Sequence, residues 1–261
     1  MTKVVCVLQI EDRHQPLQDF LLSCTAERSK TLGLRYKFFG HGMPDIPPYW
    51  WKVFRCLELL QLEDDVLDGV LWLDSDATLG RQDPRELLLD KKVAMWISPD
   101  AKPLYHSPFC AGTFLVRKNN EGIAIMQYWA SLFNKKEWEK DNTSGRWTTK
   151  GEWAGENYEQ GSFVTKILNK EPYRRWIRSL PSYVLNETAW WNPHPQCVCI
   201  HLPGDYRPQT TRVLLERIWP VIEIEAYTET PPQTITPVFS LIFLVTLLVG
   251  LFFVIKRKDQ D

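Results

Sequence analysis

The first forty residues constrain the fold most, because they alternate between apolar strands and a helix-like segment. The run Lys3–Ile10 (KVVCVLQI) is apolar and rich in β-branched residues, which is typical of a strand buried in a parallel sheet. Apolar residues then recur at helical spacing in Pro16–Leu32, and Leu34–Phe39 again has the pattern of a strand. A strand, a helix and a second strand form a βαβ unit with parallel strands. We therefore expect a doubly wound α/β sheet.

The same patterns continue to residue 222, and we assign residues 1–222 to one α/β domain. Further strands are expected at Gly69–Leu73, Val93–Ile97, Ala111–Val116, Tyr183–Leu185 and Val198–Ile200. Further helices are expected at Trp50–Leu62, Glu121–Phe133 and Glu159–Leu168. The polar segment Asn134–Gly155 carries three tryptophans and no clear period, so we expect a long, mobile loop that closes over a bound ligand.

Composition excludes one class of function and leaves another open. The formal net charge is −1, whereas a nucleic-acid-binding protein should carry a basic excess. The chain has 12 tryptophans, which suit either a tryptophan-rich core or a carbohydrate site where flat rings stack on sugars. Composition alone favours the core.

The C-terminal segment differs in character from the rest of the chain. Residues 223–237 are rich in Thr and Pro, as in an extended linker, and residues 238–255 are uncharged and almost wholly apolar. At about 1.5 Å per residue, a helix over 238–255 is roughly 27 Å long, enough to span a thin bilayer. We therefore expect a single-pass transmembrane helix, followed by a basic and polar tail at residues 256–261.

Sequence signals conflict on which side of the membrane the α/β domain lies. The basic residues Lys256–Lys258 favour the cytosolic side, which would place the domain on the opposite side of the membrane. On that side the sequons that begin at Asn142 and Asn186 could be glycosylated. The N-terminus does not resemble a signal peptide, and the 6 cysteines are scattered like free structural thiols. We favour a cytosolic domain and leave both topologies open.

The strongest chemical signal is the segment WLDSDATL, in which Asp74 and Asp76 follow the buried strand Gly69–Leu73. In open α/β sheets, ligands bind beyond the carboxyl ends of strands. Hard divalent cations prefer oxygen ligands and bridge phosphate oxygens, so two carboxylates here suit a metal–diphosphate site. An Asp pair alone is also common in solvated turns, and the buried strand that precedes it favours the metal site.

A second signal comes from His201 and Gly204 in the segment HLPG, which follows the strand Val198–Ile200. A neutral imidazole suits Mn²⁺, and glycine allows the backbone to approach a phosphate closely. A lone histidine after a strand is more often a structural one, so this signal depends on the Asp pair.

Together these segments resemble the GT-A glycosyltransferases, whose Rossmann-like mixed sheet binds a nucleotide-sugar. Phe109–Trp129 is similar to a strand–helix segment of the retaining galactosyl- and xylosyltransferases. Glu159–Leu168 and the HLPG segment are similar to two further motifs of that family, and Tyr49–Leu60 is similar to the helix that precedes its Asp-x-Asp strand. The compact size also resembles small glycosyltransferases of chlorella viruses.

The resemblance implies a role for several residues. Asp76 and His201 would bind the cation, and Asp74 would contact the metal through water or the nucleotide ribose. Lys52 would pair with a carboxylate or phosphate near the donor, and Gly112 would border the sugar. Independently of the resemblance, Gln9 and Asp12 follow the first strand and are expected to contact the nucleoside, although a simple turn explains them equally well.

We expect a metal-dependent glycosyltransferase that uses Mn²⁺ or Mg²⁺ and moves a sugar from a UDP-sugar to a glycan or glycoprotein with retention. Its transition state is oxocarbenium-like, and Glu159 is our candidate for the stabilising carboxylate, with Glu156 as the alternative. Both acids equally suit an ordinary helix N-terminus. The alternatives are a nucleotidyl- or phosphotransferase, although no Gly-rich phosphate loop is present, and a membrane-anchored carbohydrate-binding module.

Overall fold

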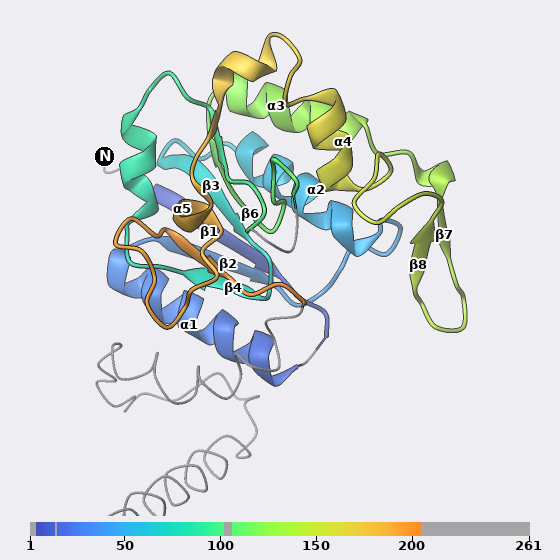
Figure 1. Cartoon of the computed structure of the whole chain (residues 1–261), viewed down its shortest axis with the longest axis horizontal. Coiled ribbons are helices and arrows are strands. Elements are labelled where there is room, and N and C mark those ends of the chain that lie inside the picture. The colour runs from blue at the N-terminus through green and yellow to red at the C-terminus, as the bar shows by residue number, and fades with distance from the viewer. Residues whose placement is uncertain (1–3, 14, 102–105, 205–261) are drawn as a thin grey trace, which may run out of the picture. The chain divides into compact units, whose positions relative to one another are not determined.

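The computed structural model describes residues 4–13, 15–101 and 106–204. Contacts divide the chain into Met1–Ile218 and Trp219–Asp261, and all described residues belong to the first unit. These residues form an α/β fold in which a central sheet lies between helices (Figure 1). The α/β fold class is thereby confirmed.

The central sheet of the described part has six strands. In spatial order they are β2 (Arg35–Phe39), β1 (Val4–Ile10), β3 (Leu67–Leu73), β6 (Thr113–Arg117), β5 (Met95–Ile97) and β9 (Ile177–Ser179). Strands β2, β1 and β3 are parallel, and β6 runs antiparallel to both β3 and β5. The sheet is therefore mixed, and the βαβ unit predicted from the first forty residues supplies its parallel part.

Two smaller antiparallel pairs complete the strands of the described chain. Strand β4 (Ala77–Leu79) pairs with β10 (Cys199–His201), which brings the segment after β3 beside the last described strand. Strand β7 (Trp138–Lys140) pairs with β8 (Trp147–Thr149) and projects from the body of the domain (Figure 1). The region predicted as a bare loop at 134–155 therefore contains a hairpin, whose short strands are too brief to show a period in the sequence.

The helices cover the two faces of the sheet (Figure 1). Helix α1 (Pro16–Leu32) lies on one face, and α2 (Pro48–Gln61), α3 (Asn120–Ser131) and α4 (Glu159–Lys166) lie on the other. The shorter helices are η1 (Pro84–Leu89), η2 (Lys135–Glu137), η3 (Tyr173–Trp176) and α5 (Ser182–Leu185).

Alternation along the strands explains why β1 and β3 are apolar throughout. Leu8 and Trp72 face the cluster formed with α2 to α4, while Val7 and Leu71 face the opposite cluster. All four side chains are at most 1% exposed, because both faces of these strands are covered. The carboxyl ends of both strands are thereby fixed within a rigid core.

One predicted strand is wrong, because Tyr183–Leu185 belongs to the short helix α5. Pro181 precedes this segment, and turn hydrogen bonds run from Val184 N to Pro181 O and from Asn186 N to Ser182 O. Three apolar residues cannot distinguish a strand from one helical turn, so the preceding proline was the better signal. The short strands β4 and β9 were also missed.

The expected transmembrane helix requires a correction. Within the described ranges, the structure contains no helix long and apolar enough to cross a membrane. The expected linker at 223–237, the apolar run at 238–255 and the tail at 256–261 lie outside those ranges. We therefore withdraw the prediction of a single-pass membrane protein, which the structure does not support.

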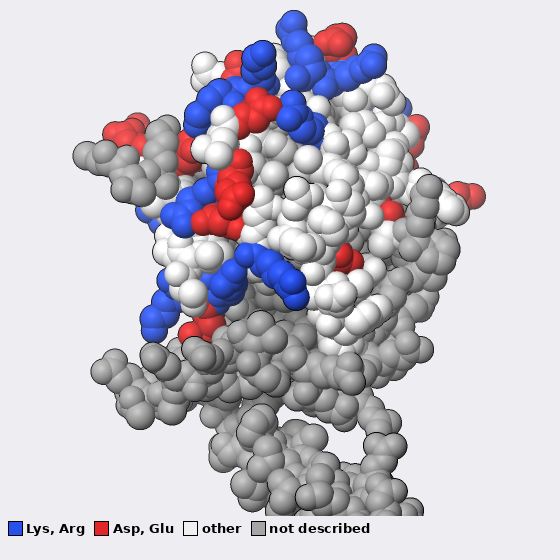
Figure 2. Space-filling model, turned by 60° about the vertical axis from the view of Figure 1, so that its left-hand side comes forward, with Lys and Arg blue, Asp and Glu red and all other residues white. Residues whose placement is uncertain are grey.

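Both signs of charge occur together on the surface. On the face shown in Figure 2, acidic and basic side chains intermingle along one strip, and the area beside it is mostly uncharged, with a few isolated acidic side chains. In the interior, all six cysteines are buried free thiols, as expected for structural cysteines.

Candidate metal and donor site

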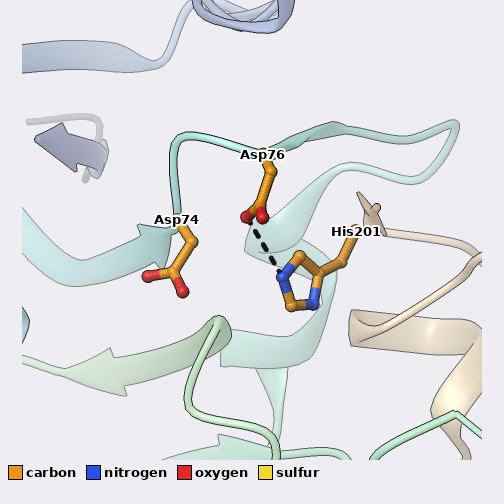
Figure 3. Close-up of side chains that lie close together, drawn as sticks. All are labelled: Asp74, Asp76 and His201. Carbon is orange, nitrogen blue, oxygen red and sulfur yellow. Dashed lines mark ion pairs between the residues drawn. The ribbon is translucent and has the colours of Figure 1, made fainter. Parts of the chain in front are cut away.

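Two strand ends bring the predicted metal ligands together. Asp74 and Asp76 follow β3, and His201 is the last residue of β10. Because β10 pairs with β4 so that His201 lies opposite Ala77, the adjacent Asp76 comes beside the imidazole. Figure 3 shows Asp76 and His201 pointing toward one another, with Asp74 at the neighbouring end of β3.

These three side chains form a compact set of possible metal ligands. One ligand atom from each of Asp74, Asp76 and His201 lies within 4.8 Å of the others. The His201 Nε2 atom is 3.3 Å from Asp76 Oδ1, and both residues are buried. Burial opposes the charge of His201, but Cys110 and the Asp76 carboxylate together raise its pKa well above the usual value. Two carboxylates and one imidazole nitrogen are a donor set that fits Mn²⁺ or Mg²⁺.

Gly112 makes room for the histidine ring. A Cβ atom on this glycine would lie 2.2 Å from His201 Cε1, far closer than van der Waals contact. The carbonyl oxygen of Gly112 also accepts a hydrogen bond of 2.8 Å from Asp74 N. The residue before β6 therefore contacts both His201 and Asp74, and only glycine fits at this position.

Lys52 of α2 lies next to the ligand set and forms ion pairs with two carboxylates. Its Nζ atom is 2.9 Å from Asp74 Oδ1 and 3.3 Å from Glu159 Oε1, and it donates to the Ala111 carbonyl at 3.1 Å. Burial opposes the charge of Lys52, but the Asp74 and Glu159 carboxylates raise its pKa. Burial raises the pKa of Glu159 above its usual value, and the charge of Lys52 only partly offsets this rise. Asp74 accepts a further bond of 2.7 Å from Trp72 Nε1.

Two residues at the end of β1 hold the Asp-containing loop. Gln9 donates from Nε2 to the carbonyl oxygens of Asp74 and Ala77, at 3.1 and 3.0 Å. Glu11 accepts a 2.6 Å hydrogen bond from the Ser75 hydroxyl and also binds Arg13. The Gln9 side chain is fully buried, and its Oε1 atom accepts a hydrogen bond from the Tyr36 hydroxyl. Gln9 therefore supports the loop from the protein interior.

The contacts that define this cluster do not include three other predicted site residues. Glu156 is exposed and forms an ion pair of 3.2 Å with Lys166. Asp12 is exposed and borders a shallow cavity of about 190 Å³ beside the β7–β8 hairpin. Gly204 follows β10 with a φ of 45°, a conformation that favours glycine.

Two amide side chains that complete the site were missed from the sequence. Gln160 accepts from Ala111 N at 2.9 Å and donates to Asp100 Oδ2 at 3.2 Å. Asn186 contacts His201 Nδ1 at 2.8 Å. Gln160 stands next to the candidate Glu159, which was the available signal. Nothing in the sequence pairs Asn186 with His201, because their contact depends on the chain after α5 lying beside β10, where Glu187 pairs with Ile200.

Comparison with known proteins agrees with this architecture. No protein-family profile matches the chain, and no curated protein matches it in sequence. The solved structure of a glycosyltransferase involved in glycosylation of the major capsid of PBCV-1 is similar, with a TM-score of 0.60 and 15% identity over 81% of this chain and 98% of that one.

Two further structures show weaker likeness. Mouse xyloside xylosyltransferase 1 gives a TM-score of 0.41 at 11% identity, over 78% of this chain and 98% of that chain. A Drosophila galactosyltransferase 7, solved with manganese, UDP-Gal and xylobiose, gives 0.39 at 12% identity, over 78% and 72%. The TM-score of 0.60 shows that this chain has the fold of the PBCV-1 capsid glycosyltransferase, and it confirms the resemblance to GT-A glycosyltransferases at the level of the fold.

Proposed function

We propose that this protein is a metal-dependent glycosyltransferase that moves a sugar from a UDP-sugar to a glycan or glycoprotein acceptor. The observation that carries the proposal is the convergence of Asp74, Asp76 and His201 at the carboxyl end of β3. The fold shared with a capsid glycosyltransferase supports it. A carboxylate-rich metal site at this edge of an α/β sheet suits a diphosphate.

Asp76 and His201 would hold Mn²⁺ or Mg²⁺, and Asp74 would complete the ligand set or contact the ribose. When bound, the cation neutralises the charge that develops on the departing nucleoside diphosphate. Lys52 and Trp72 fix the Asp74 carboxylate through direct hydrogen bonds, so that carboxylate is oriented before the donor arrives.

Glu159 is a better candidate than Glu156 for the carboxylate near the reacting sugar. Glu159 is buried and linked through Lys52 to Asp74, whereas Glu156 is exposed and paired with Lys166. We further propose that transfer proceeds with retention, with the Glu159 carboxylate stabilising the positive charge of the sugar. Burial raises the pKa of Glu159 and Lys52 opposes that rise, so the lysine favours the ionised form that this role requires.

The remaining predicted residues have secondary roles in this proposal. Gln9 holds the Asp loop from behind, and Gly112 leaves space for His201 and borders the sugar. Asp12 would contact the nucleoside from its exposed position after β1, and Gly204 would let the backbone approach the diphosphate.

An acceptor surface is available beside the site. Trp153 is 64% exposed, and its ring packs edge-on against Tyr49 at 5.1 Å and near Tyr158 at 5.0 Å. Tyr158 directly precedes Glu159, so this aromatic group adjoins the charged cluster. We assign acceptor binding to it, since an exposed indole face can stack on a sugar.

Product analysis distinguishes the proposal from its rivals. With Mn²⁺ and a panel of UDP-sugars, a glycosyltransferase releases UDP by slow donor hydrolysis even without acceptor. A nucleotidyltransferase would release pyrophosphate from a nucleoside triphosphate, and a carbohydrate-binding module would release neither. UDP release that requires Mn²⁺ and is lost in Asp76→Asn supports the proposal, and absence of UDP release from every donor contradicts it.

A further inference from the structure

We propose that Asn186 is a positioning residue that fixes the orientation and tautomer of the metal ligand His201. The inference rests on the proposed metal site and adds a residue to which no role was assigned. Asn186 follows α5, whereas the Asp ligands follow β3, so a separate part of the chain would control the geometry of the third ligand.

The hydrogen bonds of the Asn186 amide define its orientation. Its nitrogen Nδ2 donates to the Pro99 carbonyl oxygen at 3.0 Å, which requires Oδ1 to face the other way. Oδ1 lies 2.8 Å from His201 Nδ1. Because a carbonyl oxygen only accepts, His201 Nδ1 must carry the hydrogen. A ring nitrogen that binds a cation must be unprotonated, and with the hydrogen on Nδ1 the lone pair for the metal is on Nε2, the atom 3.3 Å from Asp76 Oδ1.

Asn186 is also the stronger of the two partners on that side of the ring. The Cys110 sulfur lies 3.5 Å from the same Nδ1 atom, and a thiol is a weak hydrogen-bonding group. Asn186 and His201 are 2% and 4% exposed, so water cannot readily replace the amide. Metal-binding histidines usually depend on such an acceptor for their ring orientation and basicity.

The backbone beside Asn186 holds the same histidine. Glu187 N donates to Cys199 O at 3.1 Å, and His201 N donates to Glu187 O at 2.8 Å, so the chain after α5 runs along β10. Gly112 closes the other side of the ring, where a Cβ atom would collide with it. The imidazole is therefore held in three ways: by the backbone hydrogen bond of His201 to Glu187, by contact with Gly112, and by the Asn186 amide oxygen.

Asn186 is also the first residue of the sequon Asn186-Glu187-Thr188. The nitrogen that would carry a glycan is the buried Nδ2 atom that donates to Pro99. In the folded protein this amide is engaged in positioning His201, and we assign it that function rather than glycan attachment.

The test is a Mn²⁺ titration of the purified full-length protein, with free Mn²⁺ measured by electron paramagnetic resonance. Asn186→Leu removes the acceptor at similar size, and the loss expected for an outer-shell partner is about 10- to 100-fold in Mn²⁺ affinity. Asn157→Leu is the matched control, because Asn157 donates to Thr149 and Lys150 far along the chain from the ligands and should leave Mn²⁺ affinity unchanged.

A double-mutant cycle separates positioning from general damage. If Asn186 acts through His201, Asn186→Leu should cause no further loss in a His201→Gln background. The same loss in both backgrounds, or no loss in the wild-type background, would overturn the proposal. Asn186→Asp keeps an oxygen toward Nδ1 and should retain more affinity than Asn186→Leu, and an equal loss in both also counts against it.

This experiment also distinguishes failure of the inference from failure of the proposed function. If neither Asp76→Asn nor His201→Gln changes Mn²⁺ affinity, the metal site itself is wrong. If those variants lose affinity and Asn186→Leu does not, the metal site stands and only the role of Asn186 fails. Should Asn186→Leu not fold, as judged by circular dichroism, the comparison of Asn186→Asp with wild type and His201→Gln decides the matter.

Discussion

The buried ammonium of Lys52 joins Asp74 to Glu159, at 2.9 Å from one carboxylate and 3.3 Å from the other. This contact connects the loop after β3 with the first residue of α4, two segments far apart in the sequence. It makes Lys52 an internal counterion, which is the carboxylate pairing of the two alternatives that the sequence left open.

Replacing Lys52 should therefore destabilise the protein as well as reduce activity. Lys52→Met leaves two carboxylates without their cation, and breaking a buried ion pair costs about 3–5 kcal/mol. Urea denaturation measures this change. Glu159→Gln in the same protein should recover part of the lost stability, because one uncompensated charge is removed. A Lys52→Met protein as stable as wild type would show that the lysine is not an internal counterion.

Gly112→Ala should impair metal binding with little effect on the rest of the fold. The new Cβ would meet His201 Cε1 at 2.2 Å and push the ring from its position. Mn²⁺ affinity measured by calorimetry should fall, while the circular dichroism spectrum is retained. Gly40→Ala is the control, since its Cβ would contact only Phe38 at 3.7 Å. Equal Mn²⁺ affinities of the two variants would contradict the assigned role of Gly112.

Glu11 should contribute stability that depends on pH. Burial raises its pKa, but hydrogen bonds from Arg13 and Ser75 outweigh that effect, so the pKa in the folded protein is lowered. Such a carboxylate stabilises the fold above its unfolded pKa of about 4.3, and this contribution is lost as pH falls through the lower folded value. The difference in unfolding free energy between wild type and Glu11→Gln should therefore shrink on acidification. A difference that is constant from neutral to acidic pH contradicts this account.

The β7–β8 hairpin should be the first part of the domain to be cut by protease. Its turn, from Asp141 to Arg146, is exposed, whereas Trp138 at its base is buried. If the hairpin closes over the donor, UDP with Mn²⁺ should slow cleavage at residues 141–146, as followed by mass spectrometry. Cleavage at an unchanged rate would argue against a lid.

Trp153→Ala should raise the KM for acceptor more than it lowers kcat. The exposed indole is assigned to acceptor binding, and its removal leaves the metal ligands untouched. Trp191 is the matched control, since it is likewise exposed, at 59%, and packs against Trp190 in a different part of the structure. Steady-state kinetics with varied acceptor will separate the two variants, and an equal effect of both would remove Trp153 from the acceptor site.

Periodicity predicted the elements that are long or fully buried. The bounds of α1 and β1 match the sequence pattern closely, because their apolar residues repeat over several turns or pleats. The short elements β4, β9 and α5 carry only three or four residues, too few for a period to appear. The mixed sheet also depends on β6 running antiparallel to β3, a pairing between distant segments that local pattern does not specify.

The sequence singled out the proposed metal ligands but missed several of the residues that hold them. Asp74, Asp76 and His201 each follow an apolar strand, so their positions at strand ends could be inferred. The supports at Gln9, Glu11, Gln160 and Asn186 depend on contacts across the fold. Asp83 shows the same limit outside the site. It caps η1 and binds Arg85, so Asp83→Asn is expected to lower stability.

The most direct test of the central claim is calorimetric binding of UDP in the presence and absence of Mn²⁺. We predict that wild type binds UDP tightly only with Mn²⁺, and that Asp76→Asn abolishes the Mn²⁺-dependent part by removing a ligand charge. Asp83→Asn, measured below its unfolding temperature, should retain it. UDP binding that is independent of Mn²⁺, or Mn²⁺-dependent binding that survives in Asp76→Asn at wild-type affinity, would contradict the metal site proposed for this protein.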